Sequence, residues 1–281
     1  MNFGYLIFVA EHETIPYDRL AYALALSIKA TQKPGYDKVA LVIDDPDRIS
    51  NFNSPWVFDE IIEWDNEQGW DGRSWMDKLS PWDYTVCLDS DMLFFRDYSH
   101  WVDYFVENCD LYVANNSNTY RGETVTSDYY RKTFTANNLP NLYSFYTFFK
   151  KDSELVNEFF ELGRHIIKNP VEFSNTFLTK LKPKVVGTDE ALALSAEILD
   201  IRDQISYPLE FPKVVHLKGH IQNFPWPAEL ASDHIGFYLN DDCDLKLGNY
   251  QQTDIVHYVE KDKITLETVN ILEERVWKKN T

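Results

Sequence analysis

The stretch that decides the fold lies near residue 90 and reads Tyr84-Thr-Val-Cys-Leu-Asp-Ser-Asp-Met-Leu-Phe-Phe-Arg96. An apolar run over 86–88 ends in two carboxylates one residue apart, Asp89 and Asp91, and a second apolar run follows over 92–95. Successive side chains of a strand point to opposite faces, so residues i and i+2 share a face. Open α/β sheets bind ligands at the carboxyl ends of their strands. The sequence therefore predicts a buried strand that delivers two aspartates to a ligand site.

The paired aspartates are typical of a divalent-metal site. Two hard oxygen donors suit Mg²⁺ or Mn²⁺, usually alongside substrate phosphates, although aspartate is also common in turns that bind nothing. The chain has only ten glycines and contains neither Gly-x-Gly-x-x-Gly nor Gly-Lys-Ser/Thr. These absences exclude dinucleotide binding of the Rossmann type and P-loop chemistry. A diphosphate ligand would then need a metal ion rather than a glycine cradle.

Composition narrows the class of protein further. The 281 residues are 44% apolar and carry a formal net charge of −18, which allows a packed core and argues against broad binding to nucleic acid. The three cysteines are widely spaced, without a Cys-x-x-Cys pair, which argues against a zinc ribbon or a disulfide scaffold. No apolar run reaches the roughly 18 residues of a membrane span, and the N-terminus lacks a signal-peptide pattern. We expect a cytoplasmic protein.

The pattern of apolar runs predicts a single α/β domain over 1–281. Strands are expected at 3–9, 38–43, 58–64, 110–114, 214–217 and 254–259, and helices at 17–31, 154–167, 189–199 and 265–277. Near-continuous apolar strands that alternate with helices indicate a mostly parallel central sheet flanked by helices. The chain shows no linker that would divide it.

A histidine-bearing segment far downstream supplies a candidate third metal ligand. It reads Val214-Val-His-Leu-Lys-Gly-His-Ile-Gln-Asn-Phe-Pro-Trp226. An imidazole at the end of a strand completes a set of two oxygens and one nitrogen, which favours Mn²⁺. His216 fills this role, and His257, at the end of its own expected strand, is its rival.

With these motifs together, the sequence resembles the metal-dependent glycosyltransferases of the GT-A fold, especially family 8, which includes glycogenin and bacterial lipopolysaccharide galactosyltransferases. That family carries Asp-x-Asp after an apolar strand and later His-x-x-Gly-x-x-Lys-Pro-Trp. Here Asp89-Ser-Asp91 and His216-Leu-Lys-Gly219 match, and Pro225-Trp226 lies two residues further on than expected. This context favours His216 over His257. The stretch 246–258 is also faintly similar to uncharacterised glycosyltransferases of tailed phages.

The resemblance implies a Rossmann-like GT-A domain, with 1–116 binding a nucleotide sugar and 117–281 binding the acceptor. The donor would be a UDP-sugar whose two phosphates are bridged by Mn²⁺ or Mg²⁺ on Asp89, Asp91 and His216. Asp189 would be the catalytic residue that orients the acceptor or the developing positive charge on the sugar, with retention of configuration. The donor-binding residues would be Phe8, Val9, Ala10, Lys78, Ser90 and Gly219.

Two departures from the family pattern bear on the acceptor and the phosphate contacts. The Lys of the final motif is absent, with Gln222 or Asn223 near its place, and the family's Asn-x-Gly segment is replaced at 142–146. The acceptor is left open as a glycan, a protein or a small molecule. A modified DNA base is less favoured because the chain is acidic.

Two other functions fit Asp-x-Asp after a strand. In a haloacid-dehalogenase-type phosphatase, Asp89 would be the nucleophile and Asp91 the general acid, but the motif lies far from the N-terminus and Leu93 stands where that family has Thr or Val. A non-catalytic binding protein with the GT-A fold is the other alternative, because a fold does not fix a function.

Overall fold

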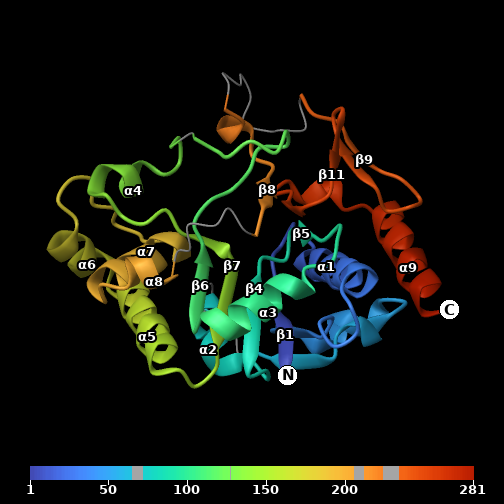
Figure 1. Ribbon diagram of the computed structural model, residues 1–281, viewed down its shortest axis with the longest axis horizontal. Coiled ribbons are helices and arrows are strands. Elements are labelled where there is room, and N and C mark those ends of the chain that lie inside the picture. Colours follow the sequence, from blue (N-terminus) through green and yellow to red (C-terminus); the bar gives the residue numbers. More distant parts are fainter. Residues whose placement is uncertain (65–71, 127, 206–211, 224–233) are drawn as a thin grey trace.

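A six-stranded mixed sheet forms the centre of the molecule (Figure 1). The computed structural model describes residues 1–64, 72–126, 128–205, 212–223 and 234–281. The strand order is β3-β2-β1-β4-β7-β6. The strands are β1 (Phe3–Val9), β2 (Val39–Ile43), β3 (Glu60–Glu63), β4 (Tyr84–Leu88), β6 (Leu111–Ala114) and β7 (Tyr143–Lys150). Only β7 runs antiparallel to its neighbours, so the predicted α/β class with a mostly parallel sheet is confirmed.

Helices cover both faces of this sheet, as the alternation along β1 requires. Phe3, Tyr5 and Ile7 belong to the core under α1 (Tyr17–Thr31), whereas Leu6 and Phe8 belong to the core on the other face. That second core is closed by α5 (Glu154–Lys168) and α7 (Thr188–Ile198). Because both faces are buried, β1 is apolar at almost every position.

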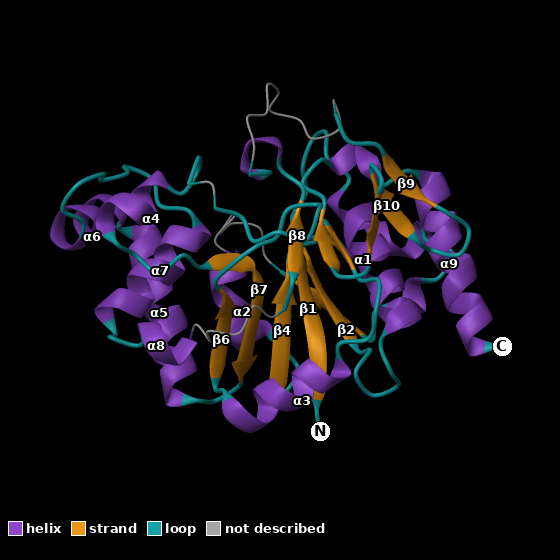
Figure 2. Cartoon of the chain, turned by 45° about the horizontal axis from the view of Figure 1, so that its top comes forward, coloured by secondary structure: helices purple, strands orange, loops and turns teal. Residues whose placement is uncertain are grey.

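A small sheet brings the C-terminal part of the chain to the end of β4. Its strands are β5 (Met92–Leu93), β12 (Ile255–His257) and β8 (Val214–His216), with β12 in the middle. Figure 2 shows β8 beyond the upper ends of β1 and β4. The strand expected over 254–259 is shorter in the structure, because Val259 takes a left-handed conformation with φ of 58°.

The remaining elements lie around these two sheets. A second three-stranded sheet consists of β9 (Phe237–Leu239), β10 (Leu245–Leu247) and β11 (Tyr250–Gln252). The other α-helices are α2 (Met76–Leu79), α3 (Ser99–Asn108), α4 (Lys132–Asn137), α6 (Pro170–Phe177), α8 (Arg202–Ile205) and α9 (Leu266–Asn280), which packs on α1. Within the described ranges, every helix is too short or too polar to cross a bilayer.

Candidate metal centre

The two aspartates follow β4 directly and are fixed by their backbones. The Asp89 amide donates to the Phe145 carbonyl at the start of β7 (3.3 Å), and the Asp91 carbonyl accepts from the Tyr258 amide (3.1 Å). The Asp91 side chain is buried, and that of Asp89 is partly exposed. The turn is therefore held from one side by the central sheet and from the other by the segment after β12.

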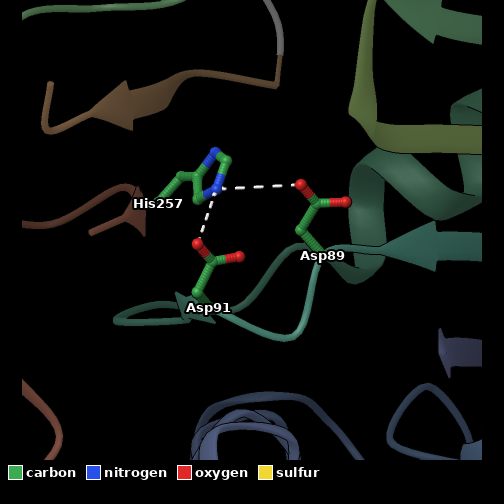
Figure 3. Close-up of side chains that lie close together, drawn as sticks. All are labelled: Asp89, Asp91 and His257. Carbon is green, nitrogen blue, oxygen red and sulfur yellow. Dashed lines mark ion pairs between the residues drawn. The ribbon is translucent and has the colours of Figure 1, made fainter. Parts of the chain in front are cut away.

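His257 lies against both carboxylates (Figure 3). Its Nε2 is 3.1 Å from Asp91 Oδ2 and 3.7 Å from Asp89 Oδ2. In the part of the chain that the structure describes, these three residues form the only cluster of three or more His, Cys, Asp or Glu side chains with metal-ligand spacing, and their ligand atoms lie within 4.8 Å of one another. Two oxygens and one imidazole nitrogen form a donor set that suits Mn²⁺.

Strand order explains why His257, rather than His216, reaches the aspartates. In the small sheet His257 is paired with Met92 of β5 on one side and with His216 of β8 on the other. His216 is thus one strand further from Asp91. Its ring meets that of His257 edge to face, with centroids 4.7 Å apart at 89°. The geometry therefore favours His257 as the third metal ligand, which the sequence motifs had ranked below His216.

Each aspartate also has a basic partner. Arg73 Nη1 lies 3.0 Å from Asp89 Oδ1, and Lys261 Nζ contacts Asp91 Oδ2. Burial raises the pKa of Asp89, and Arg73 and His257 offset this only in part. For Asp91, burial also acts to raise the pKa, but His257 and Lys261 outweigh it and hold that pKa well below its usual value.

A cavity of about 400 Å³ opens beside the three candidate ligands. Its wall contains residues from both halves of the sequence, among them Tyr17, Phe145, Asp189 and Lys218. This volume lies within the range of ordinary small-ligand sites.

Asp189 is held in this cavity as a fixed carboxylate. Its Oδ1 accepts from the Ser144 amide (2.8 Å), and its Oδ2 pairs with Arg131 Nη2 (2.8 Å). Arg131 is buried, and its guanidinium lies 3.8 Å from the centre of the Tyr143 ring. The N-cap residue of α7 is Gly187. The Asp189 side chain therefore does not cap the helix and lies in the cavity wall.

None of the six predicted donor-binding residues lies in the described cavity wall. Phe8, Val9, Ser90 and Gly219 are buried, and Ala10 at the end of β1 is partly exposed. None of these five belongs to the wall as described.

Lys78 lies elsewhere as well. It donates to Asn157 Oδ1 (2.6 Å) and pairs with Asp77 (3.4 Å), and it lines a different cavity together with Trp75. Pro225-Trp226 lies outside the described residues.

The basic residues that do reach the cavity are ones that sequence reasoning missed. Arg73, five residues before Lys78, points to Asp89, and Lys261 lies four residues after His257. Neither residue belongs to a motif named from the sequence, and the one available signal was their closeness in sequence to Lys78 and to His257. Gln222 instead stabilises the turn after β8, because its amide donates to the carbonyls of His216 and Lys218.

Comparison with solved structures identifies the fold. The chain aligns with mouse xyloside xylosyltransferase 1 at a TM-score of 0.50 and 10% identity, over 77% of this chain and 88% of that one. It aligns with GlyE of Streptococcus pneumoniae TIGR4 at 0.51 and 13%, over 98% and 63%. It aligns with the bifunctional glycosyltransferase WbbM at 0.55 and 12%, over 99% and 51%. The fold is GT-A.

These similarities concern the fold alone, because the sequence identities are low. The chain spans about two thirds of GlyE and half of WbbM. Its sequence matches no protein-family model and no curated protein. In this GT-A chain, the cluster of Asp89, Asp91 and His257 stands at the carboxyl end of β4, where ligands of open α/β sheets bind.

Proposed function

We propose that this protein is a metal-dependent glycosyltransferase that moves a sugar from a UDP-sugar to an acceptor. The observation that carries the proposal is the Asp89–Asp91–His257 cluster, whose ligand atoms lie within 4.8 Å of one another beside a cavity in a GT-A fold. The expected ion is Mn²⁺ or Mg²⁺. The family 8 resemblance supports a UDP-sugar and retention of configuration.

The residues of the cluster fit such an ion. Asp89 and Asp91 would supply oxygen ligands and His257 a nitrogen, while His216 supports the His257 ring from the next strand. When bound, the ion supplies Lewis-acid stabilisation of the diphosphate leaving group. Arg73 and Lys261 place two further positive charges at this end of the cavity, where negative charge develops as the glycosidic bond breaks.

Asp189 is the proposed catalytic residue. Arg131 and the Ser144 amide fix its carboxylate in the cavity wall, where it orients the acceptor or stabilises the positive charge that develops on the sugar. Of the residues expected near the base and ribose, Ala10 is the partly exposed one. The acceptor is a glycan, a protein or a small molecule, and we propose that residues 117–281 contribute its contacts.

The geometry does not favour the phosphatase alternative. That mechanism needs Asp91 to donate a proton, whereas His257 and Lys261 keep its pKa below the usual range despite burial. An ionised Asp91 suits a metal ligand better than a general acid.

A panel of nucleotide sugars tests the proposal. We expect Mn²⁺-dependent hydrolysis of one UDP-sugar, measured as UDP release, and its loss in Asp91→Asn or in excess EDTA. Asp262→Asn is the control, because Asp262 is an exposed aspartate of the same region that pairs with Lys263. Equal hydrolysis with EDTA present contradicts metal dependence. Binding of metal and UDP without turnover of any donor would instead indicate a non-catalytic protein.

A further inference from the structure

One oxygen of the candidate metal centre has two competing partners. Asp91 Oδ2 lies 3.1 Å from His257 Nε2 and also contacts the ammonium group of Lys261. If Asp91 Oδ2 and His257 Nε2 hold a cation together, that cation and the ammonium group compete for the same carboxylate oxygen. This step rests on the proposed function, because it assumes that the cluster takes a divalent ion.

We propose that Lys261 is a resident counter-ion that a divalent cation displaces from Asp91 and that then binds the diphosphate of the donor. Metal and diphosphate would bind cooperatively for this reason. The metal releases the ammonium group that the diphosphate needs, and the diphosphate holds the ammonium away from the metal ligand.

The position of Lys261 allows this exchange. His257 is fixed in the small sheet, and the left-handed turn at Val259 returns the chain to the cavity, whose wall includes both Val259 and Lys261. The Lys261 side chain is about one quarter exposed, so it is not locked in the core. A lysine ammonium is a point charge on a flexible four-carbon stem, which re-points without backbone movement.

The balance of charges in the cavity wall also supports cooperative binding of the metal and the diphosphate. Its described wall has equal numbers of basic and acidic residues, namely Arg73, Arg131, Lys218 and Lys261 against Asp89, Asp91, Asp189 and Glu190. The formal charge is therefore zero. A divalent cation alone or a doubly charged diphosphate alone leaves two uncompensated charges, and the two together restore balance. Opposite charges at short range in a partly buried site attract strongly, so each ligand raises the affinity for the other.

The variant Lys261→Met tests the exchange because it is expected to move two affinities in opposite directions. Without its competitor, Asp91 binds Mn²⁺ about fivefold more tightly in the absence of anion. Without the ammonium, inorganic pyrophosphate binds about tenfold more weakly at saturating Mn²⁺. Titration calorimetry measures both, with free concentrations corrected for the Mn²⁺–pyrophosphate complex in solution.

Two further variants serve as controls. Lys263→Met removes a nearby lysine that pairs with Glu260 and Asp262, and it should change neither affinity. Lys261→Arg keeps the charge and should retain pyrophosphate binding. If Lys261→Met does not fold, Lys261→Gln replaces it, and the coupling in the wild-type protein is itself a test.

The proposal is overturned if Lys261→Met weakens Mn²⁺ binding in the absence of anion, if it leaves both affinities unchanged, or if wild-type Mn²⁺ and pyrophosphate bind independently. Pyrophosphate carries neither sugar nor base, so the result is separate from glycosyl transfer. Opposed shifts in a protein that hydrolyses no nucleotide sugar would support the counter-ion role and contradict the proposed activity. Turnover of a UDP-sugar without such shifts would support the proposed activity and contradict the counter-ion role of Lys261.

Discussion

His216 lies in the cavity wall as a neutral imidazole. Burial, followed by the neighbouring His257 and Lys218, lowers the pKa of His216 well below its usual value. The unfolded chain therefore binds a proton at this residue below about pH 6.5, whereas the folded protein binds it only at a lower pH. Stability from this source is complete above that pH and falls as the solution becomes more acidic.

This protonation difference predicts a measurable slope. Between pH 6.5 and 5.5, the free energy of unfolding of the metal-free protein should fall by up to about 1 kcal/mol through His216 alone. In His216→Gln that part of the slope should disappear. Urea denaturation of both proteins at several pH values, with EDTA present, measures the difference. Identical slopes in the two proteins would show that His216 binds its proton equally in the folded and the unfolded state.

At the scale of elements, the order of three short strands decides which histidine serves the metal. β12 lies between β5 and β8, so His257 is the inner histidine and His216 the outer one. We expect His257→Ala to weaken Mn²⁺ binding about 100-fold, as for loss of a direct ligand, and His216→Ala to weaken it by about tenfold, as for a supporting residue. Manganese titration followed by electron paramagnetic resonance compares the two. A larger loss in His216→Ala would reverse the assignment.

The long buried strands could be predicted from the sequence, whereas the pairing of these short strands could not. β1 and β4 were predictable because burial on both faces makes them apolar throughout, and the aspartates follow β4 directly. β12 and β8 are three residues long, and β12 pairs with β5 over a separation of more than 160 residues. Such a pairing leaves no periodic pattern in the sequence, so motif context alone ranked the two histidines. β7 was not predicted, although turn residues flank it at Asn137-Asn-Leu-Pro-Asn141 and at Asp152-Ser153.

At the scale of the whole molecule, net charge and the local charge of the cavity act differently on ligands. The chain carries −18 overall, while the described cavity wall is formally neutral. The surface should attract a divalent cation and repel a nucleotide diphosphate from a distance. Added salt screens both effects, since the Debye length falls from about 30 Å at 0.01 M to about 10 Å at 0.1 M.

This difference predicts opposite salt dependences for the two ligands. Between 10 and 150 mM NaCl, the affinity for Mn²⁺ should fall, because the attractive field is screened, whereas the association rate of UDP at saturating Mn²⁺ should rise. Stopped-flow fluorescence of the tryptophans measures the rate, and uridine, which is uncharged, is the control that should not respond. An association rate that falls with salt would mean that the cavity's own cations, such as Arg131, Lys218 and Lys261, dominate the field that an approaching diphosphate meets.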